Sequence, residues 1–186
     1  GDSTDDTVLV ITGTTEAGAT IVFSNITVAS ASTGTRVSGT TVTADSSGDW
    51  VVTTDTLSDA TSYLISIIAT DVAGNSSLAG TFTVNIDTTA PATPTIDTVA
   101  DDVGSITGAL TTGDDSDDTV LVITGTAEAN SVLTFTGVTL DPVGTVTTNG
   151  SGAWTATTAT LSDATTYNIS VSSADAAGNA TGSATF

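Results

Sequence analysis

Short runs of alternating apolar and polar residues fill this chain. Thr, Val, Ile, Ser and Ala dominate, and residues 62–70 place Tyr63, Ile65, Ile67 and Ala69 on alternate positions. Alternation with a period of two is typical of a strand with one buried face, and no run keeps the 3.6-residue period of a helix for long. Turn residues recur roughly every 8–12 positions, as they do in all-β domains. The pattern therefore predicts an all-β fold of many short antiparallel strands.

The strands that this pattern predicts can be assigned to residue ranges. In the first half we expect strands over residues 7–14, 20–26, 50–56, 62–70 and 80–86, with one or two more within 27–44. The second half repeats this plan and adds strands over residues 95–99 and 105–110.

The second half largely repeats the first. DTVLVITGT at residues 6–14 returns at 118–126, TLSDAT at 56–61 returns at 160–165, and DVAGN at 71–75 returns as DAAGN at 175–179. Such self-similarity indicates a repeated module. We expect domains at residues 1–88 and 89–186, joined by a short acidic linker in which Pro91 and Pro94 restrict φ. In this alignment copy one lacks its first strand and copy two lacks the end of its last, as in a piece of a longer array.

The two copies differ by one insertion. Copy one has eight more residues than copy two between the turn at Glu16 and Trp50, around the sequence SASTGTRVSG. Insertions are tolerated best in surface loops, which also carry binding functions. This loop contains Arg36, the only basic residue, and is the place where we would expect a ligand-binding site.

Charge excludes several classes of partner. Twenty-one acidic residues face one basic residue, for a net charge of −20. Nucleic acids and anionic lipid surfaces attract Lys and Arg, so neither is an expected partner. The absence of Cys excludes disulfides and thiolate metal sites, and no apolar run approaches the roughly 20 residues of a membrane helix. Strong acidity favours solubility and cation binding.

Seven or so short strands per copy favour an immunoglobulin-like sandwich. Tyr63 and Tyr167 each follow a TLSDAT turn at the expected start of the penultimate strand, where such sandwiches carry a tyrosine corner. The motifs D-x-x-G-x-W at Asp45, L-S-D-A-T-x-Y, A-x-D-x-A-G-N and I-D-T-T-A-P resemble the bacterial Ig-like tandem repeats in the extender regions of large, type I-secreted, RTX-type surface adhesins. Copy two departs from the first motif, with Asn149 in place of Asp45.

The resemblance implies two tandem immunoglobulin-like antiparallel β-sandwiches in a calcium-rigidified spacer on the bacterial cell surface. Such a spacer projects a distal binding domain for adhesion and biofilm formation, and its partners are the neighbouring repeats of the same chain.

Glutamate placement suggests where calcium would bind. The chain has only two Glu, Glu16 and Glu128, at the same position in the two copies. In an Ig-like sandwich we expect this turn to lie near the D-x-A-G-N turn and the entry of the first strand. For copy two this would bring Glu128, Asp175 and the linker residue Asp87 toward one point. Because Ca²⁺ takes six to eight oxygens, acids from three loops could form the core of a site. The alternative is that these are ordinary solvated turns, since Asp, Gly and Asn are common turn formers. The candidate ligands are Glu16, Asp71, Asp87, Glu128 and Asp175.

A second acidic cluster lies early in copy two and is partly repeated in copy one. Its spacing is not that of an EF-hand loop, and a solvated acidic loop is the simpler interpretation. The candidate ligands here are Asp101, Asp102, Asp114, Asp117 and Asp118. In copy one, Asp2, Asp5 and Asp6 correspond to Asp114, Asp117 and Asp118 and are candidate ligands as well.

Catalysis is not expected. With no His, Cys or Lys, carboxylates are the remaining general bases. Trp50 and Trp154 could stack on sugars, but their equivalent positions after a glycine turn favour a role in the core. The main alternative to a spacer is a ligand- or carbohydrate-binding module that uses the loop around Arg36.

Overall fold

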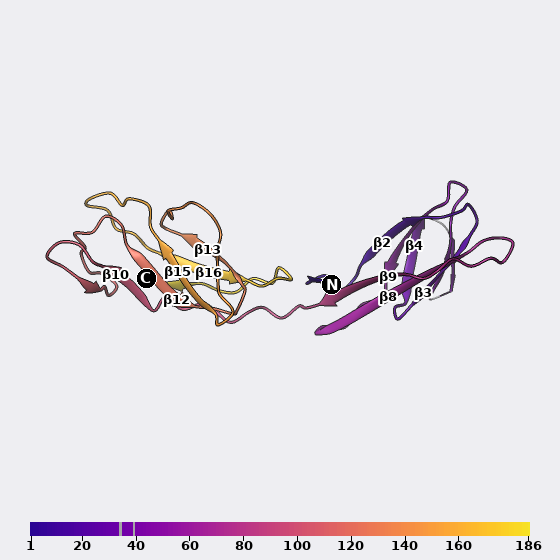
Figure 1. Ribbon diagram of the computed structural model, residues 1–186, viewed down its shortest axis with the longest axis horizontal. Coiled ribbons are helices and arrows are strands. Elements are labelled where there is room, and N and C mark those ends of the chain that lie inside the picture. The colour runs from indigo at the N-terminus through magenta and orange to yellow at the C-terminus, as the bar shows by residue number, and fades with distance from the viewer. Residues whose placement is uncertain (34, 39) are drawn as a thin grey trace. The chain divides into compact units, whose positions relative to one another are not determined.

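The computed structural model describes residues 1–33, 35–38 and 40–186, with the side chains of residues 1–27, 29–31 and 40–186. Every regular element among these residues is a β-strand, which confirms the predicted all-β class. No helix in this described part of the chain is long and apolar enough to cross a membrane. The chain divides into two compact units, Gly1–Thr89 and Ala90–Phe186 (Figure 1).

Unit 1 is a two-layer sandwich. One layer is a six-stranded sheet in the order β1, β9, β8, β3, β6, β5, and the other is a three-stranded sheet in the order β2, β7, β4. The strands in chain order are β1 (Asp2–Thr4), β2 (Val10–Thr14), β3 (Thr20–Ser24), β4 (Val28–Thr33), β5 (Thr35–Ser38), β6 (Thr41–Thr43), β7 (Asp49–Thr54), β8 (Thr61–Thr70) and β9 (Gly80–Ile86).

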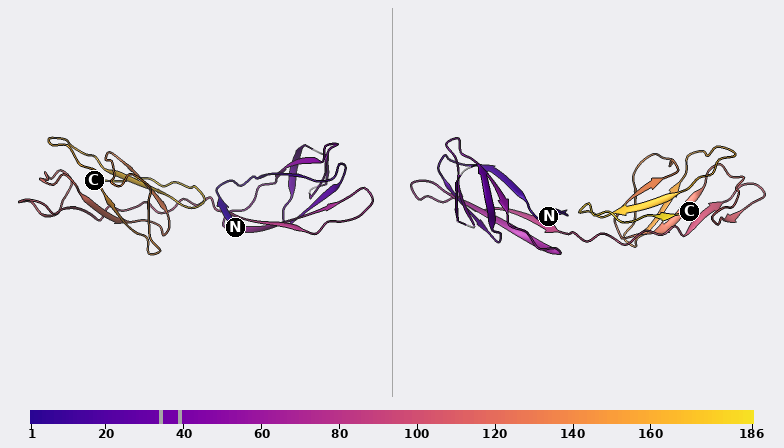
Figure 2. Two further views of the ribbon diagram at one scale, coloured as in Figure 1. Left: turned by 45° about the horizontal axis from the view of Figure 1, so that its top comes forward. Right: turned by 180° about the vertical axis from the view of Figure 1, so that it is seen from behind.

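Unit 2 is also built of two sheets, each with four strands. Its sheets have the orders β11, β10, β12, β15 and β14, β13, β16, β17. Two further views show the layers of each unit (Figure 2). The strands are β10 (Thr98–Asp101), β11 (Gly108–Ala109), β12 (Val122–Thr126), β13 (Val132–Thr136), β14 (Val146–Thr147), β15 (Ala153–Thr157), β16 (Ser170–Ala174) and β17 (Ala184–Thr185).

Each core is built from the inward positions of these alternating strands. In β7 the buried side chains alternate with more exposed ones, as in a strand with one face on the core. Trp50 packs edge-on against Phe23 with ring centroids 5.6 Å apart, and Trp154 packs likewise on Phe135 at 5.4 Å. Because both indoles are almost fully buried, the predicted core role is confirmed.

A tyrosine corner stabilises each unit. The phenol oxygen of Tyr63 accepts a hydrogen bond from the backbone N–H of Ser58 at 2.8 Å, and Tyr167 accepts one from Ser162 at the same distance. This hydrogen bond ties the TLSDAT turn to the strand that follows it, as in immunoglobulin-like sandwiches. Strand order and tyrosine corner together confirm the predicted immunoglobulin-like fold.

Two details of the strand prediction were wrong. The segment 27–44 contains three strands, β4, β5 and β6, rather than one or two. The insertion lengthens this segment enough for β5 to pair back on β6, with Arg36 opposite Val42. The Arg36 side chain, on which a binding role would depend, lies outside the described side chains. The other detail is that β1 pairs with β9 in parallel, Asp2 opposite Val84, in an otherwise antiparallel unit.

Candidate functional site

The two repeated turns of each copy lie at one end of its sandwich. In unit 1, Thr20 pairs with Thr70, so the Glu16 turn before β3 adjoins the turn that begins at Asp71 after β8. A side chain added at Gly18 would meet the Val72 side chain at 3.6 Å, which confirms that the turns touch. In unit 2, Val132 pairs with Ala174 and places the Glu128 turn beside the Asp175 turn in the same way. Both Glu side chains are exposed.

The Asp of each D-x-A-G-N motif holds its own turn together. Asp71 accepts hydrogen bonds from the Asn75 backbone N–H and from the Asn75 side-chain amide, both at 2.7 Å. These bonds, the side-chain amide first, hold the pKa of Asp71 below its usual range. Asp175 accepts bonds from Asn179 in the same way and from the N–H groups of Ala177 and Gly178. Burial raises its pKa, and the hydrogen bonds, led by that from the Asn179 side chain, lower it by more.

Asp87 lies at the opposite end of unit 1 from Glu16 and Asp71. Ile86, the last residue of β9, pairs with Thr61 at the start of β8, whereas Asp71 follows the end of β8. The Asp87 N–H donates to the Thr4 carbonyl at 3.0 Å, and its carboxylate accepts from the Thr89 N–H at 3.1 Å. Asp87 therefore lies away from Glu16 and Asp71, and its predicted grouping with Glu128 and Asp175 of the other unit stays a prediction.

Asp59 holds the same end of unit 1, a role that the sequence analysis did not assign. Its carboxylate accepts the Thr88 N–H at 2.7 Å and the Thr89 hydroxyl at 3.2 Å. The Thr88 N–H is the main reason that the pKa of Asp59 is lowered. Asp59 belongs to TLSDAT, so the signal was present as a repeated motif, but its partners come from 29 and 30 residues later in the chain.

The acidic segment of unit 2 contains two buried acids, and a hydroxyl group links the carboxylate of one to the backbone of the other. Asp101, 2 % exposed, accepts the Ser116 hydroxyl at 2.5 Å, and Ser116 Oγ also accepts the Asp118 N–H at 3.1 Å. Asp118 is 9 % exposed; its Oδ1 accepts the Val120 N–H at 2.8 Å. Its Oδ2 is buried and has no hydrogen-bond partner among the described residues. An unpartnered buried carboxylate oxygen is destabilising by about 1–3 kcal/mol or more.

The other acids of this segment bind backbone or lie in solvent. Asp117 accepts the Ser105 N–H at 2.9 Å, and Asp114 accepts the Thr111 N–H at 2.8 Å. These N–H groups are the leading cause of a lowered pKa in each case. Asp102 is exposed.

Unit 1 repeats the hydrogen bond of the Asp118 turn at Asp6. The Asp6 N–H donates to the Thr4 hydroxyl at 3.2 Å, as the Asp118 N–H does to Ser116. Asp6 is nevertheless exposed, as are Asp2 and Asp5. The bridging hydroxyl was missed in the sequence analysis, although Thr4 and Ser116 occupy matching positions.

Three or more acidic side chains close enough to share a metal ion do not occur in the described part of the chain. The arrangement that fits a cation best is therefore smaller than the sequence suggested: two buried acids, Asp101 and Asp118, with the Ser116 hydroxyl bonded to the carboxylate of Asp101 and to the backbone of Asp118. Calcium takes carboxylate and other hard oxygen ligands and completes its shell with carbonyl oxygens and water.

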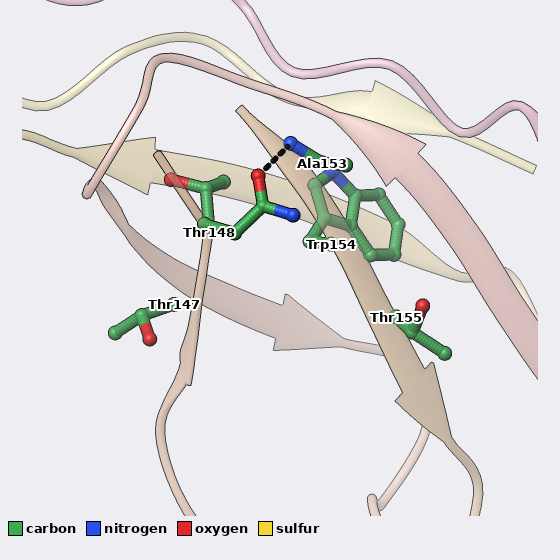
Figure 3. A pocket seen from close by; sticks show the side chains of 6 residues that line it. Thr147, Thr148, Ala153, Trp154 and Thr155 are labelled. Carbon is green, nitrogen blue, oxygen red and sulfur yellow. Dashed lines mark hydrogen bonds between the residues drawn. The ribbon is translucent and has the colours of Figure 1, made fainter. Parts of the chain in front are cut away.

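The position shared by Asp45 and Asn149 is a turn cap. Asp45 Oδ1 accepts the N–H groups of Ser47 and Asp49, and Asn149 Oδ1 accepts those of Ser151 and Ala153. The Asn149 to Ala153 bond, 3.0 Å long, joins two of the residues that line a hollow of about 350 Å³, to which Trp154 also contributes (Figure 3). Since an amide oxygen serves as well as a carboxylate here, the departure in copy two leaves the turn unchanged. Trp154, 3 % exposed, offers this hollow no open ring face for a sugar.

Comparison with known proteins gives likenesses of fold only. No protein-family model and no curated protein matches the chain. A solved structure of the FN1-FN3 domains of chicken CNTN1 superposes with a TM-score of 0.47 at 15 % identity, over all of this chain and 64 % of that one. The D00-D0 domain of intimin superposes with a TM-score of 0.34 at 18 % identity, over all of this chain and 94 % of that one.

Proposed function

We propose that this chain is a non-enzymatic spacer segment of a bacterial cell-surface adhesin, in which tandem Ig-like units carry a distal binding domain away from the cell. The observation that carries the proposal is that the motifs common to both copies are used inside their own unit. Asp45 and Asn149 cap a turn, Tyr63 and Tyr167 form the tyrosine corner, and the D-x-A-G-N turns bind their own Asp. Contacts of this kind are what a structural spacer requires, because they stabilise each unit and bind no partner.

We further propose that calcium stabilises unit 2 at Asp101 and Asp118. The buried Oδ2 of Asp118, without a partner among the described residues, supports a cation there more directly than any other group. A cation at 100 times its dissociation constant would add about 2.7 kcal/mol to the stability of the unit that binds it. Extracellular calcium sites bind in the sub-millimolar to millimolar range, so such a site would fill outside the cell and not in the cytosol.

Thermal unfolding of the full chain in calcium, in magnesium and in chelator tests the calcium site. Asp118→Asn should abolish a calcium-specific rise in the melting temperature of unit 2. Asp6→Asn, the matched change at the exposed counterpart, should leave the rise intact. Equal behaviour of the two variants, or no calcium effect on the unaltered chain, would refute the site.

Small-angle scattering on the same samples tests the spacer itself. A spacer should give an extended particle with and without calcium. A compact particle would contradict the proposed role. The binding module around Arg36 would then be the next candidate.

A further inference from the structure

One turn has the same shape in both units but a different chemistry. Asn149 stands where copy one has Asp45, and Gly150 follows it, which makes this the only Asn-Gly pair in the sequence. The Gly152 N–H donates to the Asn149 carbonyl at 2.9 Å, and the Asn149 N–H donates to the Ala153 carbonyl at 3.0 Å. Unit 1 repeats both bonds at 3.0 Å. Because glycine has no side chain, its backbone nitrogen can approach the amide of a preceding asparagine closely.

The side-chain oxygen of Asn149 is surrounded by hydrogen-bond donors. Its Oδ1 accepts the Ser151 N–H at 2.9 Å, the Ser151 hydroxyl at 2.7 Å and the Ala153 N–H at 3.0 Å. The last of these bonds is drawn in Figure 3. Donors fixed around a carbonyl oxygen stabilise the negative charge that forms there when a nucleophile adds to the carbonyl carbon. The turn therefore activates Cγ of Asn149 as an electrophile.

The nitrogen that could attack Cγ and the nitrogen that would leave are both free of hydrogen bonds. Within the described part of the chain, neither the Gly150 backbone N–H nor the side-chain nitrogen of Asn149 makes one. Both residues are exposed, and a Cβ built on Gly150 would meet no atom within 4 Å beyond its chain neighbours. The bond from the Ser151 N–H to Oδ1 closes a ring that contains Gly150, so the amide folds back over the Gly150 backbone.

Two other asparagines of the chain are held in the opposite way. The side-chain nitrogens of Asn75 and Asn179 donate to Asp71 and Asp175, at 2.7 and 2.9 Å. These bonds hold the nitrogen that would have to leave. The residue that follows each of these asparagines also carries a Cβ. Asn75 and Asn179 are therefore internal references for the reactivity of Asn149.

We propose that Asn149 is a site of spontaneous deamidation, through a cyclic succinimide formed with Gly150. The Gly150 nitrogen loses its proton to hydroxide and bonds to Cγ of Asn149. The bond from Cγ to the side-chain nitrogen breaks, and this nitrogen takes a proton from water and leaves as ammonia. Water then adds to either carbonyl carbon of the ring and opens it, which gives aspartate or isoaspartate. No electrons are transferred, and water is the only co-reactant.

The turn is retained in only one of the two products. An aspartate at this position reproduces Asp45, whose Oδ1 accepts the Ser47 N–H at 2.7 Å and the Asp49 N–H at 3.0 Å. In an isoaspartate the main chain runs through Cβ and Cγ, which lengthens it and displaces the backbone groups that close the turn. Copy one therefore already has the deamidated form of this turn, and we expect aspartate as the main product in the folded chain.

The test is incubation of the full chain in mildly alkaline buffer, folded and in urea, with peptide mass spectrometry to follow the exchange of the amide for a carboxyl group. Asn149 should convert faster in the folded chain than in urea, and faster than Asn75 and Asn179. Ser151→Ala removes one of the donors and should slow conversion about two- to tenfold in the folded chain but not in urea.

Unit 1 provides a matched gain of reactivity. Asp45→Asn together with Ser46→Gly builds the Asn-Gly pair into the same turn and should create a second site of conversion. Asp45→Asn alone keeps Ser46 and should convert much more slowly. Asn149→Asp represents the product and should leave the melting temperature unchanged.

Three results would overturn the proposal. Conversion of Asn149 that is no faster in the folded chain than in urea would show that the turn protects the residue. Equal rates for Ser151→Ala and the unaltered folded chain would show that the donors do not activate Cγ. Fragmentation that distinguishes the two products provides the third result, since an excess of isoaspartate in the folded chain would contradict the retained turn.

Discussion

The backbone N–H of Leu9 donates a hydrogen bond to the hydroxyl oxygen of Thr54 at 3.0 Å, and the Thr54 N–H returns one to the Leu9 carbonyl at 2.9 Å. Leu121 and Thr158 repeat both bonds at 3.0 Å in unit 2. Both Thr side chains are almost fully buried. These pairs tie the segment before β2 and β12 to the strand beside it.

Replacing these threonines should therefore have unequal effects. In unit 2, Thr158→Val leaves the buried Leu121 N–H without a partner and should destabilise that unit by about 1–3 kcal/mol. In unit 1, Thr54→Val should destabilise by about 1 kcal/mol or less, because water reaches the half-buried Leu9 N–H at the sheet edge. Urea unfolding followed by fluorescence measures both, since each unit contains one buried Trp. Equal losses of stability in the two variants would contradict the placement of β2 at the edge of its sheet.

The tyrosine corners give a second pair of matched variants. Tyr63→Phe and Tyr167→Phe each remove one hydroxyl group and leave the Ser58 or Ser162 N–H without its acceptor. Each change should lower the stability of its own unit by about 0.5–1.5 kcal/mol and leave the other unit unchanged. The measurement is the unfolding midpoint of each unit. A loss shared by both units would show that they do not unfold independently.

The D-x-A-G-N turns allow a turn cap to be distinguished from a metal ligand. Asn149 performs the capping role of Asp45 with an amide oxygen, so Asp71→Asn should keep the turn and most of the stability. Asp71→Ala should lose about 1 kcal/mol, as for other capping side chains. Melting temperatures with and without calcium check this. A calcium response that disappears in Asp71→Asn while the turn persists would show that Asp71 is a ligand after all.

Stability should fall in acid through specific carboxylates. A group whose pKa is lower in the folded than in the unfolded chain stabilises the fold above the unfolded value of about 3.9 and loses that effect as the pH falls through the folded value. The melting temperature should therefore drop below about pH 4, in spite of reduced repulsion among the acids. Asp71→Asn should make the drop shallower. A melting temperature that rises on acidification would show that repulsion dominates. The groups concerned are Asp59, Asp71, Asp114, Asp117 and Asp175.

Asp59 should control local motion at the end of unit 1. Asp59→Ala removes the acceptor of the Thr88 N–H and the Thr89 hydroxyl, so residues 88 and 89 should exchange and relax faster. Unit 2 should be unaffected by this change. Its matching residue, Asp163, accepts a hydrogen bond from its own neighbour Ala164 and does not depend on Asp59. Backbone ¹⁵N relaxation measures the effect. Unchanged order at residues 88 and 89 would show that β9 alone holds this end.

The parts of the fold that the sequence predicted are those that depend on local pattern. Alternation located β8 to within one residue and β9 at Gly80–Ile86, and the TLSDAT-Tyr spacing identified the tyrosine corner. Pairing could not be predicted in the same way. The parallel partner of β1 lies about 80 residues away, and strand order within 27–44 depends on how the insertion folds back.

The candidate site illustrates the same limit. The residue types of the acidic segment were visible, but the sequence ranks its acids equally. Burial distinguishes them: Asp101 and Asp118 are enclosed, while Asp102 is exposed. That difference arises from β10 and from the Ser116 hydroxyl, which acts across 15 residues of sequence. No local pattern encodes it.

The identity of β2 and β12 also has a kinetic consequence. As the chain folds, β10 meets two acceptor strands of the same sequence, and contact strength alone does not choose between them. The length of the connecting loop decides which of the two strands β10 pairs with. Residues 102–121 separate β10 from β12, and residues 15–97 separate it from β2. A loop roughly four times longer costs about 1.2 kcal/mol more to close, so β10 reaches β12 first. Chain connectivity, and not sequence, thus protects these near-identical neighbours from exchanging strands.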